Sequence, residues 1–443
     1  MKRLVYISTA AIILITIVSC NKFLEVKPKG VVLPEKLADY EAMLNSPTLI
    51  ETYPSQALYC NDDMQGEFSA SDRSAKSNAY YWRPQLDISA EVSPSVWGQL
   101  YHSIYDANVI INYAGKSTEG TDQRKREVLG EAMAIKADCY FSLLTMYAKA
   151  YNPGEASADP GVPLVTSTNV TDKVPDRSTL QECVNEIIGL LTQASADLPE
   201  TNINRFRATK FAAFGLLARV YLYLGKYDSA LAYSTKALEK APALLDYNTL
   251  TRETVPTTEL NPETLWARLS EDYGVPGFLI YSSDLLSYFD DNDLRIPLYR
   301  RDPDPITRVY ANGNAGFGIT YPEMYLTQAE AYARAGMISE AIQIVNLIRK
   351  NRILSSAYAD ETASSGDDAL DKVLAERRRE LAFEGTRWMD MKRLDRENKM
   401  PAVERKNLET MEIEATLEPH GNGYVFEIPT RVLQFNPKMK KNH

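Results

Sequence analysis

Histidine and long apolar runs are scarce in this chain, and each shortage excludes a class of function. Its 443 residues include only His102, His420 and His443 as histidines. So few imidazoles exclude most histidine-based metal sites and catalytic triads. After the first twenty residues no stretch is apolar and long enough to cross a bilayer. We therefore expect a water-soluble body.

Positive charge is also in short supply. Lys and Arg number 49 against 59 Asp and Glu, which gives a formal net charge of −10. Because affinity for nucleic acids comes mainly from Lys and Arg contacts with phosphates, we expect no nucleic-acid partner. The proportions of hydrophobic residues (44%) and charged residues (24%) are close to globular averages. They exclude a disordered or collagen-like chain.

Cysteine is the third scarce residue. Beyond Cys20 the chain has Cys60, Cys139 and Cys183. This odd number, without CxxC spacing, argues against a disulfide framework and against a zinc site. Cys139 and Cys183 fall inside helical patterns, where we expect buried thiols. We expect no metal and no cofactor.

What the chain does have at its start is a targeting segment. Lys2 and Arg3 precede an apolar run over Ala10–Val18, which is shorter than the roughly 20 residues that a hydrocarbon core requires. This order, followed by a small residue, indicates a secretory signal peptide over residues 1–19.

The residue after the signal peptide predicts an anchor. Residues 17–20, Ile-Val-Ser-Cys, resemble a bacterial lipoprotein box, with Ile in place of the usual Leu. We expect Cys20 to be lipidated and residues 20–33 to tether the body to a membrane without spanning it. The alternative is a plain signal peptide in which Cys20 is incidental.

The spacing of apolar residues predicts a mainly α-helical body over residues 34–443. Residues 50–95 look irregular because Pro, Gly and Asp interrupt every periodic pattern there. A short strand is expected near residues 424–429. Helices are expected at residues 34–44, 93–114, 122–149 and 179–196, and a helix or helix pair is expected at residues 367–396.

Two segments match the 34-residue tetratricopeptide (TPR) pattern, in which small residues let two antiparallel helices approach. Residues 211–242 match well, with Gly225 at the turn, and residues 322–349 match in part. Residues 243–321 form a loop-rich insertion with strands near 265–269 and 307–311. Long insertions of this kind often carry ligand surfaces. The expected divisions of the body are residues 34–242, 243–321 and 322–443.

Several sequence blocks together carry a family resemblance. They are residues 23–30 (FLEVKPKG), the W-x-x-L-Y-x-x-I-x-x-A-N pattern over residues 97–108, the two TPR units, and ERRRELAFEG at residues 376–385 with RW and DMKR close behind. They resemble the SusD/RagB family of nutrient-binding outer-membrane lipoproteins of Bacteroidota. Thr386 stands where that family often has His, and the chain is short for the family.

The resemblance implies a TPR-containing helical scaffold with a loop-rich second lobe and a few short strands. It implies a lipid-anchored protein on the outer membrane that faces the cell surface. It also implies binding without catalysis, with an oligosaccharide delivered to a SusC-like TonB-dependent transporter. Two alternatives remain open. In the first alternative, the chain is a scaffold or transporter lid with little glycan affinity of its own. In the second, it binds another nutrient such as a peptide. A surface enzyme ranks third, since no GxxxxGK[ST], HExxH or GxSxG motif occurs.

The charged block at residues 376–393 invites a catalytic interpretation that its spacing does not favour. Its acids and arginines fall three residues apart, which predicts ion pairs along a helix. The pairs are Glu376/Arg379, Arg377/Glu380, Glu384/Arg387 and Asp390/Arg393. We expect Phe383, Trp388 and Met391 to face the core. The acidic run Asp290–Asp293 lacks the Gly and Glu of a calcium loop, so it predicts a hairpin turn ending in a structural Arg295.

Aromatic residues in irregular segments are the ligand-binding candidates, because a ring stacks on the C–H face of a sugar while polar groups bind its rim. The first set is Tyr80, Tyr81, Trp82 and Arg83, with Asp62, Asp63 and Arg73 as rim contacts. The second set is Tyr273, Phe278 and Tyr281. The alternative for Trp82 is that it packs its loop onto the helix beginning near residue 93. Core packing is at least as favoured for Phe278.

Overall fold

α-Helices are the main secondary structure of the chain, and its strands are few and short. The computed structural model describes residues 34–66, 68–270, 278–301, 307–309 and 316–443, and residues 36–443 form one compact unit. No helix among these described residues is long and apolar enough to cross a membrane.

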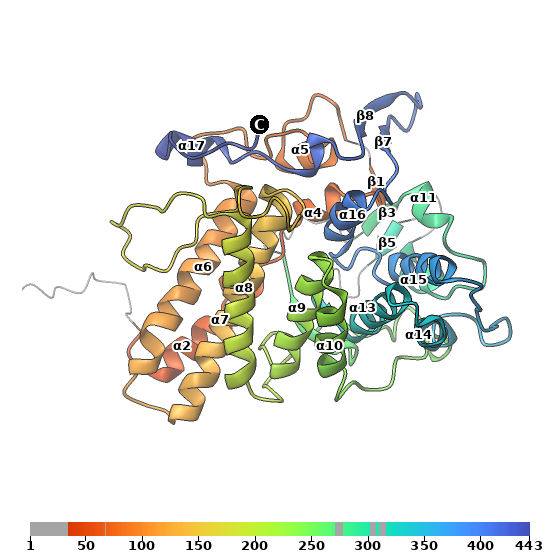
Figure 1. Cartoon of the computed structure of the whole chain (residues 1–443), viewed down its shortest axis with the longest axis horizontal. Helices are drawn as coiled ribbons and strands as arrows, with labels where there is room; N and C mark the ends of the chain where they lie inside the picture. Colours follow the sequence, from red (N-terminus) through yellow and green to blue (C-terminus); the bar gives the residue numbers. More distant parts are fainter. Residues whose placement is uncertain (1–33, 67, 271–277, 302–306, 310–315) are drawn as a thin grey trace, which may run out of the picture. The chain divides into compact units, whose positions relative to one another are not determined.

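The first half of this unit is a helical layer. It contains α2 (Leu37–Leu44), α6 (Ser95–Tyr113), α7 (Asp122–Tyr147) and α8 (Leu180–Asp197). Helix α7 packs against both α6 and α8, and the three lie side by side in Figure 1. Caps fix where these helices start, because the Thr121 and Thr179 side chains accept hydrogen bonds from first-turn amides. The predicted helices are confirmed here to within a few residues.

The two TPR-like units are confirmed as helix pairs. The first pair is α9 (Lys210–Tyr223) with α10 (Tyr227–Ala237), and the second is α13 (Tyr321–Arg334) with α14 (Ile338–Lys350). Gly225 and Gly336 make the turns within the pairs, with φ of +73° and +77°. Although residues 243–321 separate the units in sequence, α10 packs directly on α13. The predicted charged helix pair follows as α15 (Gly366–Glu380) and α16 (Arg387–Arg396).

Short antiparallel strands carry the rest of the architecture. One sheet has the order β1 (Met64–Gln65), β3 (Phe278–Tyr281), β5 (Thr307–Val309) and β4 (Arg300–Arg301). Strand β2 (Thr264–Arg268) pairs with β6 (Phe317–Thr320). The predicted strands near residues 265–269 and 307–311 are therefore confirmed.

Two expectations about local structure are wrong, and one element was not predicted. Residues 50–95 contain short helices rather than irregular chain alone. Residues 422–424 form a 3₁₀ turn, and residues 425–429 pair with no strand. The unpredicted element is a hairpin of β7 (Val403–Lys406) and β8 (Ile413–Leu417). The short helices within residues 50–95 are α4 (Gln56–Tyr59) and α5 (Ala75–Tyr80). The short helices elsewhere in the chain are α3 (Pro47–Ile50), α11 (Ser283–Leu286), α12 (Arg295–Tyr299) and α17 (Thr430–Phe435).

The core contains the residues that the sequence assigned to it. Cys139 and Cys183 are buried free thiols, and Cys60 is a third. The side chains of Phe383, Trp388 and Met391 are buried as well.

The acidic run before Arg295 has the structural role that the sequence suggested, although no hairpin forms there. Residues 290–293 turn into α12, and the buried Asp293 accepts hydrogen bonds from the guanidinium and from the backbone N–H of Arg295.

Two of the four predicted ion pairs form, those of Glu376 with Arg379 and of Asp390 with Arg393. In the other two pairs the arginines are paired elsewhere. Arg377 binds Asp390, and Arg387 binds Asp62 from a distant segment. The block is an ion-pair network, as expected, but its partners come from across the fold.

Candidate ligand-binding cavity

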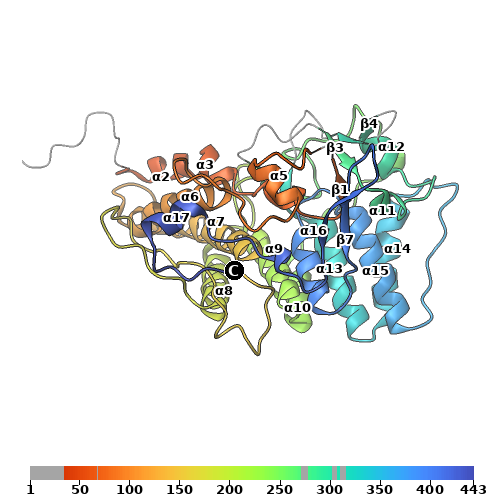
Figure 2. The same cartoon turned by 90° about the horizontal axis from the view of Figure 1, so that it is seen from above.

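A cavity of about 370 Å³ lies where three segments far apart in the sequence meet. Residues 62–65 form one wall, residues 282–284 at the start of α11 form the second, and residues 401–411 of the β7–β8 hairpin form the third. In Figures 1 and 2, β1, α11 and β7 lie together at one end of the unit. This volume is within the range of small-ligand sites in proteins.

Pairing of β1 with β3 brings the first two walls together. Met64 lies opposite Tyr281 and Gln65 opposite Ile280 in this antiparallel ladder. Beyond the ladder, the Ser282 amide donates to the Asp63 carbonyl and the Ser282 hydroxyl donates to the Asp62 carbonyl, at 2.8 and 2.7 Å. The two candidate segments predicted from the sequence are therefore neighbours in the fold.

Arg405 on β7 joins the hairpin to the first wall. Its buried guanidinium donates four hydrogen bonds, at 2.6–3.0 Å, to backbone carbonyls. It also lies 4.2 Å from the ring centre of Tyr80 and 4.5 Å from that of Trp82. Burial lowers the pKa of Arg405. The sequence missed this residue because no signal indicated the hairpin that carries it. The carbonyls belong to Tyr59, Asn61, Met64 and Tyr80.

The acidic pair Asp62 and Asp63, of which Asp62 lines the cavity, is held by arginines. Both oxygens of Asp62 accept hydrogen bonds from Arg387, at 2.6 and 2.7 Å, while Asp63 accepts one from Arg378 at 2.9 Å. Burial opposes ionisation of Asp62, but the charges of Arg387 and Arg378 outweigh it and lower the pKa of that carboxyl. Asp62 does line the cavity. Its carboxylate is nevertheless committed to the ion pair, and Asp63 is 1% exposed.

The first set of rings is buried, which corrects the expectation of a stacking surface. Tyr80, Tyr81 and Trp82 are 1%, 6% and 5% exposed. The Trp82 indole donates to the Cys60 carbonyl at 2.7 Å, and its ring lies 4.5 Å from the Arg405 guanidinium. These contacts pack the ring inside the fold, but they do not involve the helix beginning near residue 93, onto which the alternative placed it.

The charged members of the first set support local structure. Arg83 donates to the carbonyls of residues 70 and 72 and lies 4.7 Å from the ring centre of Tyr81. The Tyr81 hydroxyl donates to Glu414 at 2.6 Å, which holds β8 in place. Arg73 is exposed and donates to the same two carbonyls as Arg83. Neither arginine lines the cavity.

The three residues of the second candidate set have different outcomes in the structure. Tyr281 is 2% exposed and packs edge-on against Phe289 and Phe383, so its ring faces the core rather than a ligand. Phe278 lies on β3. Tyr273 lies outside the described residues.

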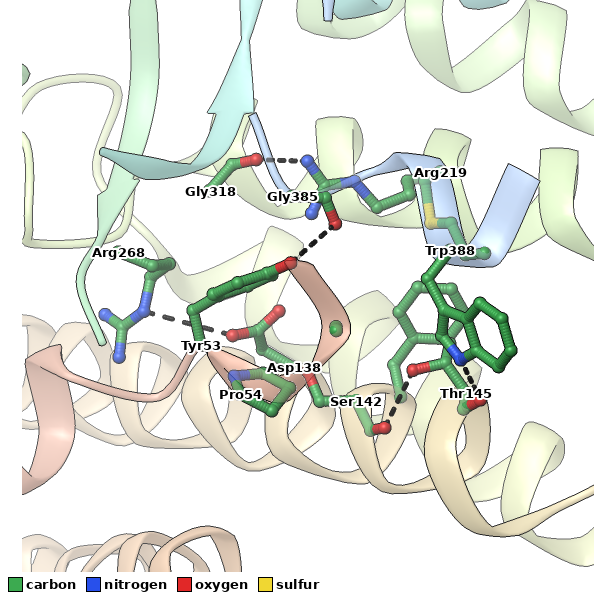
Figure 3. A pocket seen from close by; sticks show the side chains of 13 residues that line it. Tyr53, Pro54, Asp138, Ser142, Thr145, Arg219, Arg268, Gly318, Gly385 and Trp388 are labelled. Atoms are coloured by element: carbon green, nitrogen blue, oxygen red, sulfur yellow. Dashed lines mark hydrogen bonds and ion pairs between the residues drawn. The ribbon is translucent and has the colours of Figure 1, made fainter. Parts of the chain in front are cut away.

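A second, smaller cavity lies inside the molecule (Figure 3). Its volume is about 40 Å³, and its polar lining includes Asp138, Arg219 and Arg268. Asp138 accepts a hydrogen bond from Thr52, and Arg219 is paired with Glu323 at 2.6 Å. This space fits water and no sugar.

A wider depression of about 720 Å³ lies against α2 and the start of α7. Its charged groups are paired, since Arg124 binds Glu41 and Glu127, and Arg207 binds the buried Glu131 behind the surface. No residue predicted from the sequence lines it. The cavity at the β7–β8 hairpin, which includes Asp62 and Tyr80, is therefore the candidate site. Among the described residues, no group of three or more His, Cys, Asp or Glu side chains is placed to hold a metal ion.

Comparison with known proteins identifies the family. A SusD-like family model described as starch-binding and associating with the outer membrane matches residues 22–222, and the SusD family model matches residues 296–443. The chain belongs to the SusD/RagB family. The resemblance found in the sequence is thus confirmed.

Individual relatives agree over nearly the whole chain. A SusD-like protein of Formosa agariphila is 23% identical, covering 89% of this chain and 93% of its own. A SusD superfamily protein of Bacteroides thetaiotaomicron has a TM-score of 0.76 at 21% identity, covering 92% of this chain and all of its own. A putative sugar-binding protein of Bacteroides vulgatus has a TM-score of 0.75 at 24% identity, covering 93% and 99%. The predicted fold, a TPR-containing helical scaffold with few short strands, is confirmed.

Proposed function

We propose that this SusD/RagB protein binds an oligosaccharide at the cell surface and delivers it to a SusC-like TonB-dependent transporter. In this proposal Cys20 carries the lipid that holds the protein on the outer membrane. Support comes from the family, whose SusD-like model is described as starch-binding and associating with the outer membrane. It also comes from a structural neighbour titled a putative sugar-binding protein.

The cavity at the β7–β8 hairpin is the observation that carries the proposed binding role. The side chains of Gln65 and Ser283 line it and make no hydrogen bond to another described residue. The Asp284 carboxylate is 67% exposed, although one of its oxygens pairs with Arg378. Amide, hydroxyl and carboxylate groups are the partners that sugar hydroxyls require. We propose these three side chains as rim contacts.

Isothermal titration against an oligosaccharide panel tests this proposal. We expect Gln65→Ala and Ser283→Ala each to weaken binding of a responding glycan three- to tenfold, in line with the loss of about 1 kcal/mol per hydrogen bond. Gln343→Ala, an exposed substitution on α14 away from the cavity, is the control. Unchanged affinity in both cavity variants would remove this cavity from the proposal.

One observation favours the scaffold or transporter-lid alternative. The rings that the sequence offered for stacking, Tyr80, Tyr81 and Trp82, are buried. Co-purification with a barrel partner, together with no response to any glycan, would establish the lid function and contradict glycan capture. Binding of a peptide instead would identify the ligand as another nutrient.

We further propose that the protein binds without catalysis. The cavity-lining Asp62 is committed to Arg387 and Arg378, which leaves it unsuited to general acid–base work. Reducing sugar released by the purified protein would contradict this.

A further inference from the structure

The walls of the hairpin cavity are aliphatic rather than aromatic. Apart from Tyr80, which is 1% exposed, its apolar lining comes from side chains without aromatic rings. Rings suit the flat C–H face of a pyranose. Branched and thioether side chains instead enclose a small projecting apolar group. The aliphatic residues are Met64, Pro401, Ala402, Val403, Leu408 and Met411.

Two of these side chains project from the hairpin tip. Met411 is 63% exposed and Leu408 is partly exposed, and both line the cavity. Apolar side chains left in water at the edge of a cavity gain free energy when a ligand covers them. Met411 also has φ of +60°, a conformation that costs energy for a methionine. The turn therefore holds this apolar side chain at the cavity despite a backbone strain.

Polar groups on the opposite walls limit what can bind there. Gln65, Ser283 and Asp284 face the same cavity as the hairpin tip. A wholly apolar ligand would leave Gln65 and Ser283 without water or partner and would remove water from the Asp284 carboxylate, which is costly. The ligand therefore needs hydroxyl groups for one side and a compact apolar group for the other.

We propose that this cavity selects saccharides that carry a methyl group, either 6-deoxy sugars or acetylated sugars, with the methyl enclosed by Leu408 and Met411. This inference rests on the proposed function, since it names the class of glycan that the same cavity takes.

Matched pairs of sugars test the inference. L-fucose and L-galactose differ in a methyl against a hydroxymethyl group, as do L-rhamnose and L-mannose, while N,N′,N″-triacetylchitotriose carries acetamido groups where cellotriose carries hydroxyls. Affinities are measured by saturation-transfer NMR and titration. We expect the methyl-bearing member of each pair to bind about tenfold more tightly, the usual effect of one small apolar group in a fitted pocket. Saturation should be strongest on the methyl protons.

The variant Met411→Asn with Leu408→Ser should reduce this preference to less than threefold. Asn suits the left-handed backbone at position 411, so the hairpin is expected to keep its shape. The control is Met337→Asn with Leu354→Ser, which changes the same residue types at exposed positions, 39% and 41%, that do not line the cavity.

The outcomes separate the two proposals. Equal affinity within every pair, a preference for the hydroxylated members, or no binding of either member would each overturn the inference. Binding of other glycans from the panel would still support the proposed function in those cases. No binding of any glycan would contradict both.

Discussion

At the scale of single residues, buried arginines connect segments that are far apart in the sequence. Arg405, Arg378 and Arg387 all reach the Tyr59–Tyr80 region from the last quarter of the chain. Each is nearly or wholly buried, where an unpaired guanidinium would be very costly. Their hydrogen bonds therefore fix where the walls of the cavity lie.

Replacing Arg405 with Met should destabilise the protein strongly. The substitution leaves buried carbonyls without a donor, and each such group costs about 1–3 kcal/mol. We expect the free energy of unfolding to fall by at least about 3 kcal/mol, as measured by urea denaturation with circular dichroism. Lys406→Ala changes the exposed neighbour and should stay within about 0.5 kcal/mol of the original protein. Equal denaturation midpoints for both variants would show that Arg405 is dispensable.

Glu376 should make stability depend on acid pH. Burial opposes its ionisation, but Arg295 and Arg379 outweigh this and lower the pKa of Glu376 to about 2. In the unfolded chain a glutamate has a pKa of about 4.3–4.5. Between that pH and about pH 2 the unfolded state therefore binds one more proton than the folded state. This stabilisation, about 3 kcal/mol, is complete above the unfolded pKa and disappears as pH falls to about 2.

Urea denaturation at intervals from pH 6 to pH 2.5 measures this effect. Glu376→Gln should lower stability at pH 6 and flatten the decline below pH 4.5. The exposed Glu412→Gln should follow the original protein throughout. A Glu376→Gln curve parallel to that of the original protein would contradict the assignment.

The sequence shows which residues are charged or aromatic, but it does not show which of them contact one another in the fold. The pairs Glu376/Arg379 and Asp390/Arg393 follow from helical spacing alone and are confirmed. The partner of Arg387 is Asp62, 325 positions away, and no local pattern indicates it. For Trp82 the sequence left ligand stacking and packing open, because the hairpin whose Arg405 lies against its ring was not foreseen.

At the scale of elements, prediction succeeded where periodicity is local. Helices α6, α7 and α8 and both TPR pairs lie where the spacing of apolar residues placed them. Hairpin β7–β8 was missed because its strands are short and β7, Val-Glu-Arg-Lys, has a charged residue, Arg405, at its buried position, so no apolar alternation marks it. The opposite error occurred at residues 424–429, where a strand-like composition has no partner strand.

The glycine turns of the two TPR pairs allow an element-scale prediction. Gly225 and Gly336 both have positive φ, so alanine is strained at either position. A Cβ at Gly336 would meet nothing within 4 Å, whereas one at Gly225 would lie 2.7 Å from the flexible end of Arg396. We expect Gly336→Ala to lower the free energy of unfolding by about 1 kcal/mol and Gly225→Ala by somewhat more.

Gly189→Ala on α8 is the matched control for these turns. It lies in a helix interior with nothing within 4 Å of an added Cβ. Alanine should therefore stabilise the protein by about 0.5–1 kcal/mol. Thermal and urea denaturation of the three variants compares them directly. Stabilisation in all three would show that the backbone at the two turns is not strained.

At the scale of the whole molecule, segments that are far apart in the sequence lie next to one another in the fold. The TPR pairs are interrupted by residues 243–321, yet α10 and α13 pack together as successive repeats do. The same insertion supplies β3, which pairs with β1 from the start of the body. The insertion between the two TPR pairs thus supplies one wall of the cavity. This wall lies next to β1, which precedes the first long helices in the sequence.

Membrane attachment belongs to this scale, because it decides where the whole body acts. Cys60, Cys139 and Cys183 are buried, and burial raises the pKa of Cys183 to about 11. Such thiols are unreactive, so acylation at the proposed position, Cys20, can be tested without interference from them. We expect labelled palmitate to be incorporated in the native host and lost in Cys20→Ser, with the variant released from the membrane fraction.

Cys183→Ala is the control for acylation, since it removes a buried thiol and should keep the label. Protease treatment of intact cells then tests orientation. A surface-facing protein is digested, whereas one on the inner leaflet is protected. Label retained by Cys20→Ser would place the lipid elsewhere, and an unlabelled original protein in the soluble fraction would contradict anchoring altogether. Capture of a glycan before it enters a barrel requires the cavity to face the medium, so a protected protein would also contradict the proposed delivery.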